Sequence, residues 1–200
     1  MNSVNDPGYW ETRYRNGQTR WDLGKPAPAL VTLLDSSQAP EPGKVAVLGC
    51  GRGHDAVLFA EHGHTVVGFD FAADAIAEST RLALKLDVPV MFLQHDLFEL
   101  PSSYAGHFDL VVEHTCFSAI EPGRRLEYVQ VVRRILKPGG EFIAIFFAHE
   151  RSGGPPYRTS KSELEQLFGP YFRTSRLEPV VESVPERQGE ELFGRLVRCR

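Results

Sequence analysis

The sequence predicts an α/β fold with a doubly wound, mostly parallel sheet of about seven strands. Short apolar runs rich in β-branched residues alternate with longer helical patterns along most of the chain. Near its end, two extended runs, residues 172–184 and 191–199, are joined by a polar stretch and indicate an antiparallel hairpin. A chain of 200 residues is long enough for one domain with a sizeable core.

Each element before the hairpin has its own signal. Apolar runs bounded by turn residues predict strands over 44–48, 65–70, 89–93, 108–113 and 141–147. Helical patterns predict helices over 55–62, 72–86, 124–136 and 160–168. In the second helix we expect Ile76, Leu82 and Leu86 to face the core. Residues 137–140, Lys-Pro-Gly-Gly, should stop the third helix, and Ser160 begins the fourth with a capping box.

The composition is that of an ordinary globular protein, with 42% apolar and 24% charged residues. The net charge of −4 argues against nucleic acid as a partner, and no apolar run has the length of a membrane span. Three distant cysteines show no metal-ligand spacing. The first residues lack the basic and apolar regions of a signal peptide. We therefore expect a cytoplasmic monomer without a membrane partner.

A glycine-rich turn follows the first predicted strand. Gly49, Gly51 and Gly53 stand at alternate positions, and Asp70 ends the second strand. Glycines let a ligand approach the main chain, and the acid can accept from ribose hydroxyls, so this layout suits an adenosine-bearing cofactor. A dinucleotide site has its third glycine three places after the second, where this chain has His54. S-adenosylmethionine, which has no pyrophosphate, fits better; a tight turn without a ligand is the alternative.

Polar residues follow the other strand ends as well. Asp96, Glu113, His114 and His149 come directly after or at the ends of predicted strands. Because the carboxyl ends of parallel strands meet at one edge of a sheet, we expect a single cleft there. Asp96 is placed to accept from an adenine amine, with Leu97 or Phe98 packed on the ring. It can equally be a turn-initiating aspartate.

The N-terminal arm is rich in aromatic residues. Trp10, Tyr14 and Trp21 lie in a polar stretch with proline and glycine, which is poor core material. Such a segment can cover a cationic ligand, since a sulfonium over an indole gains roughly 0.5 to 2 kcal/mol. A helix packed onto the sheet by its aromatic residues is the alternative. We expect one domain, with residues 1–40 as a lid segment and residues 44–200 as the cofactor-binding core.

The chain resembles the thiopurine, thiol and halide methyltransferases over nearly its whole length. The resemblance rests on Trp21-Asp22-x-Gly24-x-Pro26, on the turn from Leu48 to Asp55, on Leu136-Lys137-Pro138-Gly139-Gly140 and on Gly153-Gly154-Pro155-Pro156. It implies a Rossmann-like, class I methyltransferase with S-adenosylmethionine as methyl donor. It also implies cofactor contacts at Trp10, Trp21, Gly49, Asp70, Asp96, Leu97 and Glu113. We add Gly51 of the same turn, and Tyr14, which stands where the family usually has a second tryptophan.

The acceptor implied by the resemblance is a small thiol or a related soft nucleophile. A thiol has a pKa of about 8.5, so part of it is already thiolate at neutral pH and a strong base is unnecessary. His114, Arg125 and His149 are candidates for favouring the thiolate; each can instead be a loop histidine or a helix-capping or paired arginine. Residues 114–118 are more polar than is usual in the family, so they leave the acceptor open.

Three other functions remain compatible with the sequence alone. O- or N-methylation of a small metabolite would need a poised base near His114. An NAD-dependent dehydrogenase would use the same glycine turn, although His54 argues against it. A protein that binds S-adenosylmethionine without catalysis is the third.

Overall fold

The computed structural model describes residues 3–200 and contains a seven-stranded sheet in the order β3-β2-β1-β4-β5-β7-β6. Its strands are β1 (Lys44–Leu48), β2 (Thr65–Asp70), β3 (Val90–Gln94), β4 (Phe108–His114), β5 (Leu136–Phe147), β6 (Phe172–Pro179) and β7 (Glu191–Arg198). Strands β1 to β5 are parallel, whereas β7 runs antiparallel to β5 and to β6. The predicted fold class, including the C-terminal antiparallel hairpin, is confirmed.

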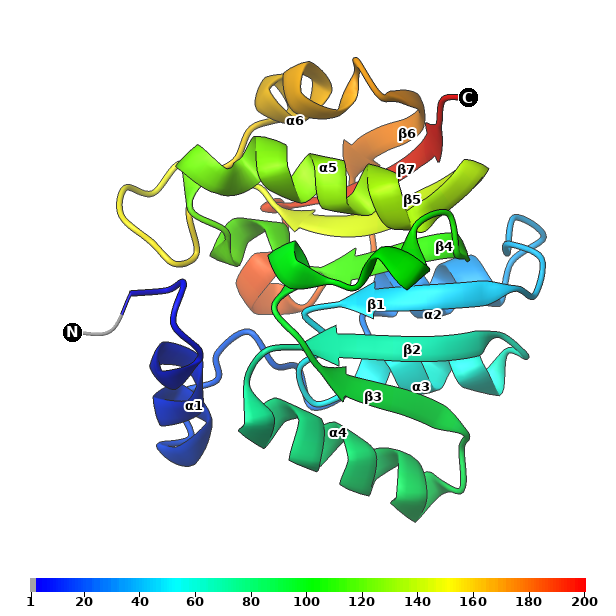
Figure 1. The fold of residues 1–200 in the computed structure, drawn as a ribbon. Coiled ribbons are helices and arrows are strands. Elements are labelled where there is room, and N and C mark those ends of the chain that lie inside the picture. Colours follow the sequence, from blue (N-terminus) through cyan, green and yellow to red (C-terminus); the bar gives the residue numbers. More distant parts are fainter. Residues whose placement is uncertain (1–2) are drawn as a thin grey trace.

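Helices cover both faces of the sheet (Figure 1). The core on one face includes side chains of α2 (Pro28–Leu34) and α3 (His54–Glu61), and the core on the other includes those of α5 (Arg125–Ile135) and α6 (Lys161–Phe168). Helix α4 (Ala73–Leu86) packs along β3, and α1 (Pro7–Arg15) packs on α4. No helix within residues 3–200 is long and apolar enough to cross a membrane.

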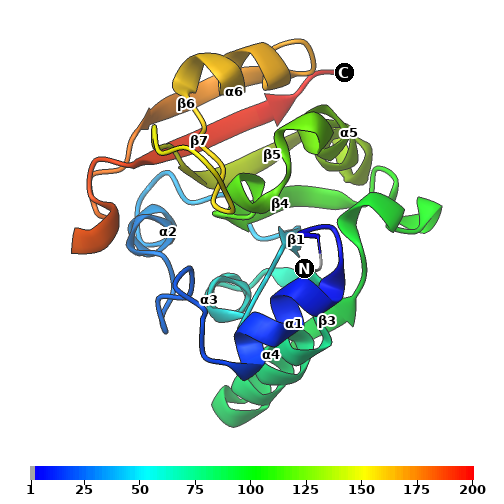
Figure 2. The same cartoon turned by 90° about the vertical axis from the view of Figure 1, so that its left-hand side faces the viewer.

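The order in which successive strands join the sheet reverses at β1. Both β2 and β4 pair with β1, so the chain leaves this strand toward opposite edges of the sheet. A crevice forms outside the carboxyl ends of the strands at such a point. The glycine turn after β1 lies there, and Figure 2 looks onto this end of the sheet with α1 in front. The fold thereby brings the N-terminal arm to the glycine turn.

The break predicted between the third helix and the fifth strand is wrong in one respect. Strand β5 begins directly after α5, because Leu136 already pairs with Phe108. The register then shifts, so that residues 137–140 form an irregularity inside the strand. A Cβ at Gly140 would lie 2.9 Å from the Asp109 carbonyl oxygen. Gly140 therefore permits close strand contact here, whereas the helix has already ended at Ile135.

The predicted inner face of α4 is also corrected. The buried residues of this helix are small: Ala75, Ser79 and Ala83. Leu86, which was expected to face the core, is 47% exposed, and Ile76 and Leu82 are only half-buried. Small residues occupy the inner face of α4 because the helix lies very close to the glycine turn, where Ser79 faces Gly53.

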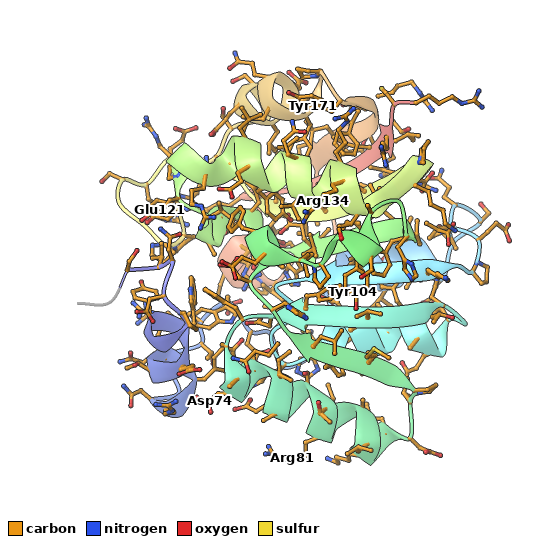
Figure 3. The ribbon with its side chains drawn as sticks, in the orientation of Figure 1. Asp74, Arg81, Tyr104, Glu121, Arg134 and Tyr171 are labelled. Carbon is orange, nitrogen blue, oxygen red and sulfur yellow. The ribbon has the colours of Figure 1, made fainter. Side chains whose placement is uncertain are left out.

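The N-terminal arm is held to two distant parts of the fold. Arg15 at the end of α1 forms an ion pair with Asp74 of α4 at 3.0 Å. The Asn5 amide donates to Glu121, in the loop before α5, at 2.9 Å. Figure 3 labels Asp74 beside α1 and Glu121 beside the segment that precedes α1. The arm therefore spans the carboxyl end of the sheet between these two contacts.

Gly53 is tightly packed within the glycine turn. A Cβ at Gly53 would lie 2.8 Å from both the Phe92 Cζ and the Ser79 Cβ, and its φ is +84°. Gly63 has the same φ of +84°, but its Cβ would meet nothing closer than Pro42 at 3.9 Å. A comparison of substitutions at these two glycines therefore separates the cost of backbone strain from the cost of steric overlap.

We expect Gly53→Ala to lower the free energy of unfolding by about 2 to 4 kcal/mol, because left-handed strain and overpacking add together. Gly63→Ala should lower it by about 1 kcal/mol, from the strain alone. Urea denaturation of both variants measures the difference. Equal losses of unfolding free energy in the two variants would show that Phe92 and Ser79 move away from the added methyl group at no energetic cost.

Candidate active site

A cavity of about 960 Å³ lies at the carboxyl ends of the parallel strands. It brings together most of the predicted cofactor residues and one predicted catalytic candidate: Trp10, Tyr14, Trp21, Gly49, Asp70, Asp96, Leu97 and His114. These residues come from the N-terminal arm, from the turn after β1 and from the ends of β2, β3 and β4. The single cleft expected from the strand ends is therefore present.

Asp70 ties the end of β2 to the glycine turn. Its carboxylate accepts hydrogen bonds from the Gly51 N–H and the Ala72 N–H, both at 3.0 Å. Burial raises the pKa of Asp70, while these N–H donors oppose that rise. Each oxygen accepts one protein hydrogen bond and retains capacity for further donors, such as the hydroxyls of a ribose.

Three aromatic side chains of the arm form one cluster over this region. The Trp21 ring packs edge-on against Trp10 at 5.3 Å and against Tyr14 at 5.7 Å between ring centroids. The Trp10 indole N–H donates to the Val4 carbonyl at 2.8 Å. Burial, followed by the charge of Asp70, raises the pKa of Tyr14. Its phenol is therefore neutral at ordinary pH and does not serve as a base.

Asp96 and Leu97 lie at the far side of the cavity, after β3. The Asp96 carboxylate accepts from the Phe98 N–H at 2.9 Å and caps the short helix Leu97–Glu99. The Arg124 guanidinium lies 3.5 Å from the centroid of the Phe98 ring. Asp96 therefore has a turn-capping role, and its side chain also lines the cavity.

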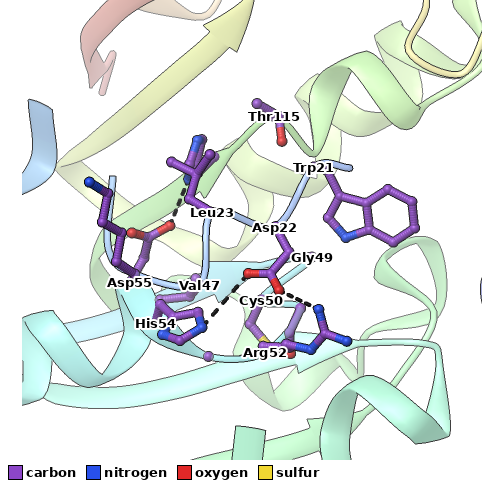
Figure 4. A pocket seen from close by; sticks show the side chains of 14 residues that line it. Trp21, Asp22, Leu23, Val47, Gly49, Cys50, Arg52, His54, Asp55 and Thr115 are labelled. Carbon is purple, nitrogen blue, oxygen red and sulfur yellow. Dashed lines mark hydrogen bonds and ion pairs between the residues drawn. The ribbon is translucent and has the colours of Figure 1, made fainter. Parts of the chain in front are cut away.

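A smaller pocket of about 50 Å³ lies beside the glycine turn (Figure 4). Gly51 lines this pocket and is absent from the described wall of the larger cavity. Arg52 binds Asp22 and Glu78 there and donates to the Thr19 hydroxyl at 2.9 Å. These contacts fasten the segment between α1 and α2 to the turn after β1.

His114 belongs to a buried polar network between the two pockets. Its Nδ1 lies 3.0 Å from the Asp55 carboxylate, and its Nε2 lies 3.0 Å from Arg187 Nη1 and 3.9 Å from Glu191. Burial lowers the pKa of His114, but the charge of Asp55 and the hydrogen bond to it together outweigh burial and raise the pKa. Both ring nitrogens are occupied by protein partners, so a direct role as a base is disfavoured.

The structure does not bring Glu113 to the wall of either described pocket. Its side chain is fully buried, and its carboxylate accepts from the Phe117 N–H at 2.9 Å. This bond supports the turn after β4, where Thr115 has a φ of +60° and lines the cavity. Burial raises the pKa of Glu113 to about 7. The position of Glu113 thus favours a role in supporting the turn after β4, in place of the cofactor contact that we expected.

Arg125 and His149 also lie outside the described cavity wall. Arg125 is buried and forms an ion pair with Glu163 at 2.6 Å, as the simpler interpretation of a paired arginine predicts. His149 is buried against the Phe147 ring, and burial lowers its pKa. Both side chains are buried and line neither pocket.

The sequence analysis did not identify several arginines that line the larger cavity. Arginines outnumber acids along the cavity: Arg13, Arg20, Arg124, Arg151 and Arg187 against Asp70, Asp96 and Glu186. Arg151 and Arg187 follow β5 and precede β7, in loops without a motif. Only their clustering in three dimensions reveals them. Arg124, Arg151 and Arg187 are paired with Glu127, Glu190 and Glu191, so Arg13 and Arg20 contribute most of the positive charge that a negatively charged ligand could meet.

The wall offers binding and orientation more than proton transfer. Burial raises the pKa of the Cys116 thiol, so this side chain is a poor nucleophile. Within residues 3–200, no group of three or more histidine, cysteine, aspartate or glutamate side chains is arranged to hold a metal ion. The described residues therefore suit a reaction that needs alignment of two reactants and exclusion of water.

Known proteins match nearly the whole chain. A family model described as thiopurine S-methyltransferase matches residues 5–194. Probable thiol methyltransferase 2 of Arabidopsis thaliana is 39% identical over 197 residues, covering 96% of this chain and 86% of that protein. Thiocyanate methyltransferase 1 of Brassica oleracea is 34% identical over 195 residues, covering 95% and 84%. A solved Burkholderia thailandensis 1,6-didemethyltoxoflavin-N1-methyltransferase with bound S-adenosylhomocysteine has a TM-score of 0.77 at 21% identity, covering 97% of this chain and 87% of that one.

The buried Glu113 carboxyl should make stability depend on pH. Its folded pKa of about 7 lies above the ordinary value of 4.5, so between these values the folded state holds a proton that the unfolded chain has released. The free energy of unfolding therefore falls as pH rises from about 4.5 to about 7. Glu113→Gln removes this titration and keeps an acceptor for the Phe117 N–H.

We expect the loss of stability between pH 5 and pH 8 to be smaller in Glu113→Gln than in the parent, by roughly 2 to 4 kcal/mol. Urea denaturation at the two pH values measures it. Glu165→Gln on the exposed face of α6 is the matched control and should leave the pH dependence unchanged. An identical slope in Glu113→Gln would mean that Glu113 is ionised in the folded state at pH 5.

Proposed function

Because the chain belongs to the thiopurine S-methyltransferase family, we propose that it transfers the methyl group of S-adenosylmethionine to a small thiol or a related soft nucleophile. The observation that carries this proposal is the single cavity that joins Asp70, the aromatic cluster of the arm and an arginine-rich wall without a free base. The first two features suit the methyl donor, and the third suits an acceptor that is already anionic.

The residues of the cavity fit the donor. A Cβ at Gly49 would lie 2.7 Å from the Cys116 sulfur, so the turn has no room for a side chain and its backbone forms the wall. We assign Asp70 to the ribose hydroxyls, Asp96 and Leu97 to the adenine, and Gly49 and Gly51 to close main-chain approach. Trp10, Tyr14 and Trp21 would face the sulfonium. When bound, S-adenosylmethionine supplies an electrophilic methyl group.

The chain's own contribution to the reaction is alignment and electrostatics. Methyl transfer is an in-line displacement, which gains most from fixed positions of both reactants and from exclusion of water. The arm covers the carboxyl end of the sheet, and Arg13 and Arg20 of the wall favour the thiolate form of an acceptor. No general base is required, which agrees with the engaged state of His114.

We further propose that residues 1–40 act as a lid segment on a core of residues 44–200, within one domain. The arm's contacts with Asp74 and Glu121 support this division. We propose a cytoplasmic monomer that acts on a free small molecule, with no nucleic-acid or membrane partner. The free cysteines Cys50, Cys116 and Cys199 support a reducing compartment.

Asp70→Asn should weaken S-adenosylmethionine binding by about 10- to 100-fold, because hydrogen bonds to a charged acceptor contribute about 1.5 to 3 kcal/mol. Isothermal titration calorimetry measures the affinity. Asp109→Asn is the control, since Asp109 lies near the start of β4, at the opposite end of the sheet, and pairs with Lys137. Unchanged affinity in Asp70→Asn would remove Asp70 from the cofactor site.

The acceptor class is tested by S-adenosylhomocysteine formation with matched thiols, phenols and amines. We expect turnover with thiols, rising with pH up to the thiol pKa of about 8.5 as the thiolate fraction grows. Turnover with phenols or amines alone would instead indicate O- or N-methylation. Binding of the donor without any product across the panel would indicate a non-catalytic role.

A further inference from the structure

Arg187 connects the C-terminal hairpin to the N-terminal arm. It lies in the short helix Pro185–Arg187, between β6 and β7, and only 7% of it is exposed. Its Nη2 donates to the Trp21 carbonyl at 2.5 Å and lies 3.5 Å from the Arg20 carbonyl. The guanidinium therefore holds the main chain at the residue whose indole belongs to the aromatic cluster.

The other terminal nitrogen of the same guanidinium contacts polar side chains of β4 and β7. Arg187 Nη1 contacts His114 Nε2 at 3.0 Å and donates to Glu191 at 3.4 Å. Nε2 is then the accepting nitrogen of a neutral ring, which leaves Nδ1 to donate to Asp55. When His114 is protonated, its Nε2–H faces Glu191 at 3.9 Å instead. The contact between His114 and Arg187 therefore belongs to the neutral ring, whereas the contacts of Arg187 with Trp21 and Glu191 do not depend on the state of the ring.

The network returns to the same segment of the arm. Asp55 accepts from the Ala27 N–H at 2.8 Å, in addition to its contact with His114. A chain of polar contacts thus runs from Trp21 through Arg187, His114 and Asp55 to Ala27. It holds both ends of residues 21–27 against the sheet, at the side of the cavity where β4 ends. Arg52 holds this segment through Asp22, and the residues just before it through Thr19.

Burial of these charges points to a geometric role. Removing a guanidinium and two carboxylates from water is costly, and an apolar cluster of equal volume is often as stable. What the ionic cluster adds is direction, because a planar guanidinium fixes several acceptors at once. Here its acceptors are a carbonyl of the arm, an imidazole of β4 and a carboxylate of β7.

We propose that Arg187 is a positioning residue that holds Trp21 over the cofactor side of the cavity, and so sets the affinity for S-adenosylmethionine from the opposite end of the chain. The proposal rests on the proposed function for its kinetic consequence. Its structural consequence, the placement of Trp21, is independent of any turnover. Lysine at this position keeps the charge, but its three donors share one nitrogen, so it cannot reproduce the contacts that Arg187 makes from two separate nitrogens.

The two tryptophans of the chain, Trp10 and Trp21, both belong to the arm, so fluorescence reports on it directly. In a Trp10→Phe background, Trp21 is the single emitter. We expect Arg187→Lys to raise the acrylamide quenching constant of Trp21 at least twofold in the protein without ligand. Arg195→Lys is the matched control: Arg195 lies on β7, pairs with Glu141 at 2.7 Å and donates to Gln38. It should leave quenching unchanged.

With Trp10 intact, Arg187→Lys should raise the KM for S-adenosylmethionine about tenfold, the effect of one lost charged hydrogen bond, while kcat changes by less than threefold. A general loss of structure would not separate KM from kcat in this way. If the lysine variant does not unfold cooperatively, Arg187→Met, which keeps the apolar stem, replaces it with the same expected shifts.

Unchanged quenching of Trp21 in Arg187→Lys would overturn the proposal, as would a fall in kcat with an unaltered KM. A parent protein that forms no S-adenosylhomocysteine would contradict the proposed function. The quenching comparison would still decide whether Arg187 positions Trp21.

Discussion

Asp70 joins the ends of two neighbouring strands through its carboxylate, which accepts from the glycine turn after β1 and from the first residues after β2. This contact holds the turn in place while the turn itself has no room for side chains. Gly49 lies against Cys116, and Gly53 lies against Phe92 and Ser79. The small inner face of α4 and the cavity wall both follow from that close packing.

The arm completes the cavity, and its position depends on charged contacts from several elements. Arg52 holds it from the glycine turn, Arg187 from the C-terminal hairpin, and Asp74 from α4. The aromatic cluster then has a defined place without belonging to either main core of the sheet. A reaction that depends on alignment requires such a defined place for the groups that surround the ligand.

Buried ionisable groups support the site without touching the cavity. Glu113 holds the turn that carries Thr115, and Arg125 joins α5 to α6 through Glu163. Such groups destabilise a core unless they are well paired, so their cost is tolerated where the geometry near a site depends on them. In this chain the sequence marks these residues as site candidates, and the structure places them behind the cavity wall.

The sequence by itself determined the order of strands and helices along the chain. It also determined the glycine turn, the position of Asp70 at a strand end and the aromatic arm. These features are local: apolar runs, alternate glycines and an acid at a strand end each have a short-range signature. Tertiary structure alone decided that Glu113, Arg125 and His149 are enclosed and that small residues face inward on α4. It also brought Arg187, 166 residues from Trp21, to the arm. The physical reason is that burial and ion pairing depend on which elements meet in space, and no local pattern encodes that meeting.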